Sequence, residues 1–294
     1  MGLIPVTAKM LRTSYVLGAL VAVTVASATV ANAEDAGLST DWAKEHSTRV
    51  RLVAGSVATA KGKPRVMAGV EIELDPGWKT YWRYPGTSGV PPRFDWAGSE
   101  NLEEAIPLFP APSRFTEKDG DTIGYKTRVV LPIEIKAKDP AKPVILRLGL
   151  EYGVCKDVCV PVQPMLELTL PPDVIAKPAN VLAAAVEQVP RVPEKRRDGD
   201  PQLKRVTIDT LGAKPNILIE AAFPGSPEGA DIFLEAPDGI WIPLPKAMGE
   251  PRDGIHRFLV DLTDGADVAD LKGRVIRTTI VSAGGRTDTS FKFE

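Results

Sequence analysis

The chain has 294 residues, of which 44% are hydrophobic and 25% charged, so it can bury one large core or two modest ones. This composition excludes a disordered tail and a disulfide-stapled miniprotein. Lys plus Arg number 36 against 38 Asp plus Glu, a formal net charge of -2, which gives no global electrostatic reason to expect a nucleic acid or an acidic lipid surface as partner.

The N-terminal segment has the pattern of a cleaved secretory signal. Lys9 and Arg12 precede an apolar, Ala- and Val-rich run over 15–30, which ends in the small-x-small triplet Ala31-Asn32-Ala33. A retained transmembrane anchor is the alternative, but it needs about 20 strongly apolar residues, and two threonines and a serine interrupt this run. The start could be Met1 or Met10. The pattern predicts export to an oxidising compartment.

Beyond the signal, the strongest pattern is a period-2 alternation of apolar and polar residues, which predicts short strands between turns rich in Pro, Gly and Asp. The predicted strands of the first stretch are 48–57, 66–74, 79–84, 128–135, 144–152 and 165–170. Those of the second are 205–209, 216–222, 231–235, 256–262, 274–281 and 287–293. No helices alternate with them, so we expect an all-β protein with two tandem antiparallel β-sandwiches.

Three segments do not follow the strand pattern. Asn180, a good N-cap residue, precedes a short helix predicted over 181–188, and the polar, proline-marked segment 189–201 is predicted as a linker. The segment 101–127 has little periodicity and is predicted as a long loop, of a kind that is often functional. The predicted boundaries are 1–33 for the signal peptide, 34–175 for the first sandwich, 176–202 for the helix and linker, and 203–294 for the second sandwich.

The chain has only two cysteines, Cys155 and Cys159, with three residues between them. A bridge closing so short a loop has a chain-entropy contribution of roughly 2 kcal/mol, against almost 5 kcal/mol for a 100-residue loop. Pro161 and the residues before the pair suit strand ends, which places both sulfurs near a sheet edge or loop tip. Lys156 would favour a thiolate and Asp157 would oppose it. The spacing leaves open a redox pair, an inert structural disulfide and a metal site.

Other candidate groups give weaker patterns. His46 and His256 are isolated, and two thiolates need further ligands to hold zinc, so neither a metal nor another cofactor is expected. A set of aromatic residues has the pattern of strand core, with partner docking as the alternative. These residues are Trp78, Tyr81, Trp82, Tyr84 and Trp96.

An ordered set of motifs makes the chain resemble a known family. The motifs are PGWKTYWRYPG over 76–86, GVPP over 89–92, PAP over 110–112, GY over 124–125 and YGVCKDVCVP over 152–161. Together they resemble the periplasmic N-terminal domain of the DsbD family of thiol:disulfide interchange proteins, especially its ScsB-like branch. The resemblance extends from about Trp42 to Leu170.

The resemblance implies roles for the cysteines. In that family an immunoglobulin-like sandwich carries a cysteine pair that takes electrons from the membrane-embedded part of the protein and passes them to periplasmic oxidoreductases. By motif position, Cys159 would form the mixed disulfide with partners, Cys155 would be the resolving thiol, and Tyr152 and Pro161 would support them. The ScsB-like branch has a second immunoglobulin-like domain, which fits the second stretch here. Family members also shield the pair with a cap loop, for which 101–125 and 78–92 are the candidates.

The resemblance therefore implies a soluble periplasmic thiol-disulfide oxidoreductase of the protein-disulfide reductase type. The expected partners are thioredoxin-like or disulfide-isomerase-like periplasmic proteins. A separate membrane electron donor of the DsbD or CcdA type is also expected, because this sequence ends at Glu294 without the membrane and thioredoxin-like domains of full-length family members. The alternative from another class is a non-catalytic envelope binding module, for instance in metal stress, with a permanent structural disulfide.

Overall fold

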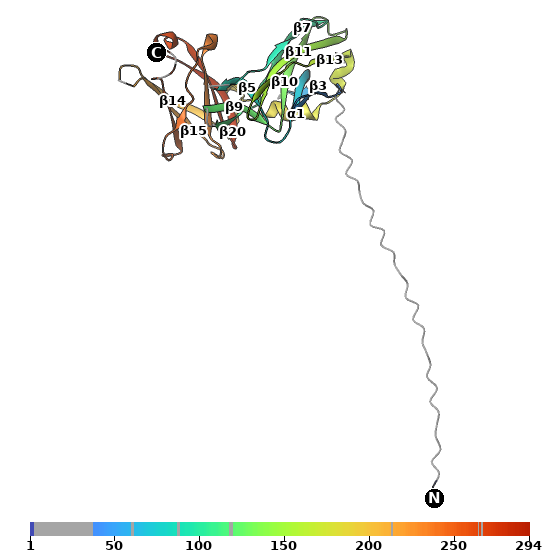
Figure 1. Cartoon of the computed structure of the whole chain (residues 1–294), viewed down its shortest axis with the longest axis horizontal. Helices are drawn as coiled ribbons and strands as arrows, with labels where there is room; N and C mark the ends of the chain where they lie inside the picture. The colour runs from blue at the N-terminus through green and yellow to red at the C-terminus, as the bar shows by residue number, and fades with distance from the viewer. Residues whose placement is uncertain are drawn as a thin grey trace. The chain divides into compact units, whose positions relative to one another are not determined.

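The computed structural model describes residues 1–2, 38–59, 62–86, 89–117, 120–212, 214–263, 265 and 267–294. Apart from Met1 and Gly2, the predicted signal peptide lies outside the described residues. Residues Asp35–Glu294 form one compact unit. Within its described part the strands form four sheets of antiparallel pairs, two before α1 and two after it (Figure 1). This arrangement confirms the predicted all-β class with two sandwiches in tandem.

The first sheet of the first sandwich is built on the long strands β3 (Thr48–Ala58) and β4 (Pro64–Leu74). Its strand order is β1-β3-β4-β10-β7, with β2 also paired to β3. Leu52, Val70 and Leu131 are buried between the two sheets, and Val53 and Met67 are buried on the opposite face, so the central strands have both faces covered. The other bounds are β1 Leu38–Ser39, β2 Ala43–Glu45, β7 Leu102–Pro107 and β10 Arg128–Ala137.

The second sheet has the order β12-β11-β5-β9-β8, and β6 and β13 also pair with β11. Strand β11 (Val144–Cys155) is the longest in this sheet and ends at Cys155. The core between the two sheets includes Trp82, Leu148 and Tyr152. The other bounds are β5 Lys79–Gly86, β6 Arg93–Asp95, β8 Ser113–Glu117, β9 Gly120–Lys126, β12 Cys159–Val162 and β13 Met165–Leu170.

The second sandwich pairs a sheet of order β14-β15-β18-β17 with a sheet of order β16-β19-β20. Its core is formed by apolar side chains of both sheets, including Ile219, Phe258 and Ile280. The bounds are β14 Gln202–Asp209, β15 Asn216–Ala222, β16 Asp231–Glu235, β17 Lys246–Ala247, β18 Ile255–Asp261, β19 Val275–Ser282 and β20 Gly285–Lys292. A short helix, α2 (Val268–Leu271), precedes β19.

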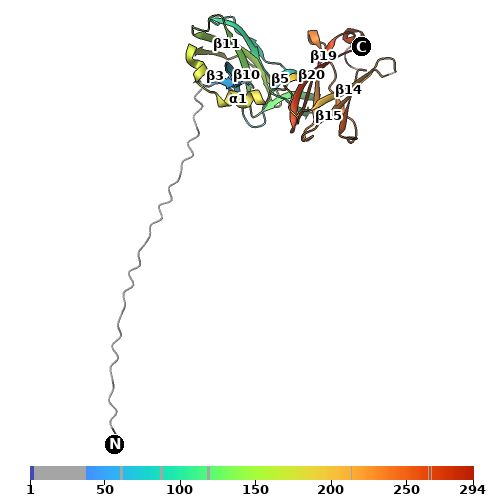
Figure 2. The same ribbon diagram turned by 180° about the vertical axis from the view of Figure 1, so that it is seen from behind.

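Helix α1 (Asn180–Glu187) lies against β3, β4 and β10 (Figures 1 and 2). Leu182 is fully buried there, and a methyl group at Gly69 would come within 2.5 Å of it, so the glycine allows the helix to approach the sheet. The predicted capping is wrong by one position: Ala179 is the N-cap and provides no side-chain cap, and Asn180 is the first helical residue. Helix ends are commonly displaced by a residue in this way.

The loop predicted over 101–127 is wrong, because β7, β8 and β9 lie within it. Pro107 ends β7, and Pro110 and Pro112 fall between β7 and β8, so the prolines interrupt the strand pattern without preventing the strands. Strands β7 and β8 are also edge strands with largely exposed residues, which removes the alternation that predicts a strand.

The predicted linker 189–201 is held in place against the second sandwich. Asp200 is 1% exposed, pairs with Arg191 and accepts hydrogen bonds from the backbone N–H groups of Arg197 and Arg286. Arg191 also forms a parallel bridge with Thr287 of β20. The boundaries at 175 and 202 stay a prediction.

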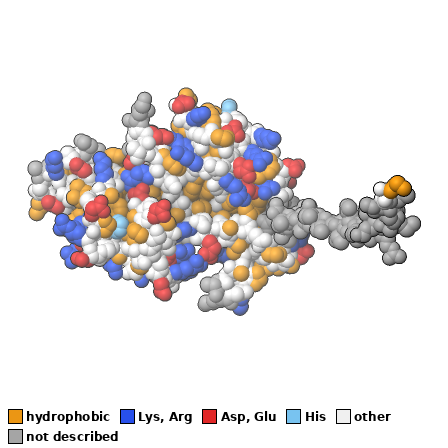
Figure 3. All heavy atoms as spheres, turned by 90° about the horizontal axis from the view of Figure 1, so that it is seen from below, with side chains coloured by type: hydrophobic (Ala, Val, Ile, Leu, Met, Phe, Trp, Pro, Cys, Tyr) orange, Lys and Arg blue, Asp and Glu red, His pale blue; other side chains and the backbone are white. Residues whose placement is uncertain are grey.

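The described surface carries both signs of charge. On the face in Figure 3, basic and acidic side chains are interspersed and not segregated by sign. This agrees with the near-neutral formal net charge of -2. In the part of the chain that the structure describes, no helix is both long and apolar enough to cross a membrane.

Candidate functional site

The two cysteines close a tight hairpin. Strand β11 ends at Cys155 and β12 begins at Cys159, and the two residues are directly opposite in the antiparallel register, with a Cα–Cα distance of 4.1 Å. Opposite residues of an antiparallel pair project from the same face, so the side chains meet and form a disulfide. The sulfurs thus lie at strand ends beside a tight connection, as the flanking residues predicted.

The two cysteines differ strongly in exposure. Cys155 is 1% exposed, whereas Cys159 is exposed on β12, a strand at the edge of its sheet. Val158, at the tip of the hairpin, is 70% exposed and gives the surroundings of Cys159 an apolar character. Thiol–disulfide exchange needs access of a thiolate to one sulfur. The arrangement makes Cys159 the accessible sulfur and Cys155 the sheltered one.

A tyrosine hydroxyl contacts both sulfurs. Tyr81, from the neighbouring strand β5, donates a hydrogen bond to Cys155 Sγ at 2.8 Å, and its oxygen lies 3.2 Å from Cys159 Sγ. Burial raises the pKa of Tyr81 above its usual value of 10.0, and the negative charge of Glu117 raises it further. The hydroxyl is therefore protonated at neutral pH and available as a donor.

Glycines allow the Tyr81 ring to lie this close to the hairpin. A methyl group at Gly153 would come within 3.3 Å of the ring and 3.1 Å of the Val90 side chain. A methyl group at Gly89 would come within 2.6 Å of the ring. The ring is thus enclosed between β11 and the segment that follows β5.

An ion pair between a buried lysine and an exposed glutamate lies on the same face as the sulfurs. Lys79, at the start of β5, is directly opposite Cys155 in the register, and its side chain is only 5% exposed. Its ammonium group pairs with Glu117 at the end of β8. The disulfide therefore has a hydroxyl donor and a paired cation and carboxylate on its own face of the sheet.

The two supporting residues predicted from the motif occupy different places. Pro161 is exposed and lies opposite Gly153, on the face of the hairpin that carries the sulfurs. Tyr152 is three residues before Cys155, so the alternation of the strand turns it into the core. There its hydroxyl lies 3.0 Å from Thr48 Oγ1, and burial raises its pKa to about 12.

The contacts of Tyr81, Lys79 and Glu117 with the site were not predicted. Tyr81 belonged to an aromatic set assigned mainly to the core, and it is indeed 2% exposed. Both cap-loop candidates border the site, since 78–92 supplies Tyr81 and Val90 and 101–125 supplies Glu117. The tips of these segments, at 87–88 and 118–119, lie outside the described residues.

The two histidines lie elsewhere. His46 is exposed in a turn at a φ of 47°, and the His256 ring packs edge-on against Phe223 in the second sandwich. Among the described residues, no group of three or more His, Cys, Asp or Glu side chains is arranged to hold a metal ion.

Comparisons with known proteins agree with the motifs. Residues 50–171 match the family model described as thiol:disulfide interchange protein DsbD, N-terminal. Among solved structures, the crystal structure of the N-terminal periplasmic domain of ScsB from Proteus mirabilis is similar, with 24% identity and a TM-score of 0.65. That match covers 87% of this chain and 98% of the other, so it includes both sandwiches. No curated protein sequence gave a match.

These findings define the class of the first sandwich. The strands from β3 to β13 lie within the matched region, apart from the first two residues of β3, and they include the cysteine hairpin. This part of the chain is a DsbD N-terminal-like domain with an immunoglobulin-like fold. For the second sandwich, the likeness to the ScsB structure shows a shared fold only.

Proposed function

We propose that this chain is a periplasmic thiol–disulfide relay in which Cys155 and Cys159 alternate between disulfide and dithiol. The observation that carries the proposal is the asymmetry of the pair, one sulfur buried and the other exposed, with one tyrosine hydroxyl on both. An inert bridge needs neither an accessible sulfur nor a donor beside it. The match to a thiol:disulfide interchange family supports the same function.

The first half of the cycle reduces the disulfide. A thiolate of a donor dithiol attacks Cys159 Sγ, which forms a mixed disulfide, breaks the bond to Cys155 and leaves Cys155 as a thiolate. The second donor thiolate attacks its neighbour in the mixed disulfide and releases Cys159. The donor becomes a disulfide, the pair gains its two electrons, and protons from solvent complete the thiols.

The second half passes the electrons on. The Cys159 thiolate attacks an acceptor disulfide and forms a mixed disulfide, and one acceptor sulfur leaves as a thiolate. The Cys155 thiolate then attacks Cys159 Sγ, restores the internal disulfide and releases the acceptor as a dithiol. In this scheme Cys155 reacts only with Cys159, which agrees with its burial.

Tyr81 assists the steps in which Cys155 carries charge. Hydrogen bonds to an ionised acceptor are stronger than those to a neutral one. The hydroxyl that donates to Cys155 Sγ in the disulfide therefore binds the thiolate more strongly, and this favours Cys155 as the leaving group.

The partners follow from the chemistry of the exposed sulfur. The apolar tip at Val158 and the edge position of Cys159 fit a protein partner with a reactive cysteine pair. We propose thioredoxin-like or disulfide-isomerase-like periplasmic proteins as acceptors and a membrane protein of the DsbD or CcdA type as the electron donor. A permanent disulfide in a binding module is the competing function.

Trapping of mixed disulfides tests the proposal. The reduced Cys155→Ala variant should accumulate a mixed disulfide with a single-cysteine variant of a thioredoxin-fold protein such as protein disulfide isomerase, whose thiol is activated as a mixed disulfide with thionitrobenzoate. Cys159 displaces thionitrobenzoate, and neither protein then has a second thiol in the site to resolve the bond. The matched variant Cys159→Ala keeps only the buried thiol and should form at least tenfold less mixed disulfide. Non-reducing electrophoresis and mass spectrometry give the yields.

Equal yields of mixed disulfide from the two variants would contradict a mechanism in which only Cys159 reacts with partners. No adduct from either variant, together with a wild-type disulfide that the reduced dithiol form of the same partner leaves unchanged, would support a permanent bridge instead.

A further inference from the structure

The elements that carry Tyr81 and Glu117 to the sulfurs also contact the second sandwich. Strand β5 has Tyr81 near its start and Arg83 two residues later, and β8 has Arg114 three residues before Glu117. Both arginines reach the same strand, β16, whose first residue is Asp231 and whose last residue is Glu235. One strand of the second sandwich therefore contacts both elements that border the disulfide.

The contact of Arg83 is bidentate. Its Nε donates to Glu235 Oε2 at 2.9 Å and its Nη2 to Glu235 Oε1 at 2.7 Å, and both side chains are about five-sixths buried. Nη2 also donates to Thr279 at 3.2 Å and lies 3.5 Å from Asp288. A bidentate pair fixes the orientation of a guanidinium group as well as its position. The side chain of Arg83 thus attaches β5 to three strands of the second sandwich.

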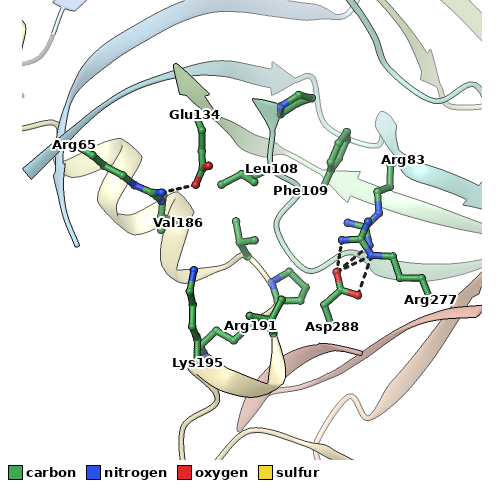
Figure 4. A pocket seen from close by; sticks show the side chains of 14 residues that line it. Arg65, Arg83, Leu108, Phe109, Glu134, Val186, Arg191, Lys195, Arg277 and Asp288 are labelled. Atoms are coloured by element: carbon green, nitrogen blue, oxygen red, sulfur yellow. Dashed lines mark hydrogen bonds and ion pairs between the residues drawn. The ribbon is translucent and has the colours of Figure 1, made fainter. Parts of the chain in front are cut away.

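Figure 4 shows the surroundings of this contact. A cleft of about 490 Å³ opens beside it, with Arg83 and Arg277 both directed at Asp288 at one end. At the other end Arg65 pairs with Glu134, and both of these residues belong to the first sandwich. The same cleft thus has an ion pair that joins the two sandwiches and another that does not.

The contact of Arg114 has the same geometry. Its Nε donates to Asp231 Oδ2 at 2.8 Å and its Nη2 to Asp231 Oδ1 at 2.6 Å, and Nη1 lies 3.1 Å from Asp121. Burial raises the pKa of Asp231, while its hydrogen bonds to Arg114 lower it. This second bidentate pair attaches β8 to the start of β16.

An apolar contact lies between the two ion pairs. Phe233 is two residues from each acid of β16, so the alternation of a strand puts all three side chains on one face. Its ring lies 5.6 Å from that of Trp82, and both residues are fully buried. Next to it, Tyr84 donates to the Ile242 carbonyl at 3.0 Å. The face of β16 is therefore packed against β8 at Asp231 and against β5 at Phe233 and Glu235.

We infer that this face of β16, formed by Asp231, Phe233 and Glu235, positions the redox pair. It holds β5 and β8 through Arg83 and Arg114, and so keeps Tyr81 beside the sulfurs. The inference rests on the proposed function. If β5 is no longer held, the Tyr81 hydroxyl donates a weaker hydrogen bond to Cys155. The dithiol form then loses more stabilisation than the disulfide form, because the Cys155 sulfur is the better acceptor as a thiolate. Arg83 and Arg114 are positioning residues in this arrangement.

The test uses the full chain equilibrated with reduced and oxidised glutathione. Glu235→Gln and Asp231→Asn should each shift the equilibrium toward the disulfide by about threefold to tenfold, the effect of one weakened hydrogen bond. Glu134→Gln breaks the Arg65 pair in the same cleft and should leave the equilibrium unchanged. The two variants of β16 are independent, so either one carries the test if the other fails to fold.

A double variant separates positioning from general destabilisation. If β16 acts through Tyr81, adding Glu235→Gln to Tyr81→Phe should shift the equilibrium no further than Tyr81→Phe alone. The inference would be overturned if Glu235→Gln and Asp231→Asn had the same dithiol–disulfide equilibrium as the wild type. It would also be overturned if the shift of the double variant were the full sum of the Glu235→Gln and Tyr81→Phe shifts. A wild-type pair that stays oxidised in every buffer would overturn the proposed function, and this inference with it.

Discussion

At the level of single residues, the site depends on one hydroxyl group. Tyr81 is buried, its raised pKa keeps it protonated at neutral pH, and its hydrogen bond to Cys155 Sγ is the direct contact with the sheltered sulfur. Neighbouring groups supply the charge, since Lys79 is buried on the same face and paired with Glu117. The rate at which the Cys155–Cys159 disulfide is reduced should therefore fall more on loss of this hydroxyl than on loss of other buried hydroxyls.

The Tyr81→Phe variant should reduce about tenfold more slowly with dithiothreitol, because the departing Cys155 thiolate loses a hydrogen bond worth about 1.5 kcal/mol or more. The rate of thiol appearance at neutral pH measures this. Tyr125→Phe is the matched control, since it also removes a buried tyrosine hydroxyl, one that donates to the Pro110 carbonyl at 2.8 Å. Equal slowing in the two variants would mean that the effect is structural.

At the level of elements, the position of β5 depends on its neighbour β9. A methyl group at Gly124 would lie 1.9 Å from the Thr80 carbonyl oxygen, so Gly124→Ala must force the two strands apart. We expect a loss of about 1–3 kcal/mol in the free energy of unfolding, the usual range for overpacking. Urea unfolding measures it. Gly98→Ala, where the methyl group meets only ordinary contacts at 3.5 Å, should cost far less, and equal losses would contradict the close approach of β5 and β9.

The sequence predicted strands that carry buried apolar residues, whether these alternate, as in β15, or form a run, as in β16. The predicted bounds of β13, β15 and β16 are those of the structure. Strands β7 and β8 were missed because both lie at the edge of a sheet and are mostly exposed. An edge strand has few buried residues, so its local pattern is that of a loop.

The site was predictable only in part for a similar reason. The motif singled out Cys155 and Cys159, which are close in the sequence and form one hairpin. Tyr81 is 74 residues from Cys155, and Lys79 is 38 residues from Glu117. Their meeting depends on the register of β5 against β11 and β9, which local patterns do not encode. Tyr152 was assigned to the site from its place in the motif, but strand alternation turns its side chain into the core.

At the level of the whole molecule, the buried tyrosines link stability to pH. Burial is the main cause that raises the pKa of Tyr81, Tyr84, Tyr125 and Tyr152 above 10.0, to about 12 for Tyr152. Above pH 10 the unfolded chain loses these protons while the folded chain keeps them. The free energy of unfolding should therefore be constant with respect to these groups below pH 10 and fall above it.

The Tyr152→Phe variant isolates one of these groups. Below pH 10 it should be less stable than wild type by about 1 kcal/mol, since it loses the bond to Thr48. Between pH 10 and about 12 the advantage of the wild type should fall by at most about 1.4 kcal/mol per pH unit, so that it closes near pH 11 and reverses by pH 12, because only the wild type still carries this titration. Urea unfolding across this range measures it. A difference that does not change with pH would contradict the raised pKa.

The two sandwiches act together if the pair is a working redox couple, because β16 then holds the strands that surround it. The most direct measurement is the reduction potential of the Cys155–Cys159 pair in the intact chain, from its equilibrium with glutathione buffers of known ratio. A working couple should have a potential above about -300 mV, so that the dithiol is populated in these buffers. A potential well below about -300 mV would mark a structural disulfide and contradict the relay.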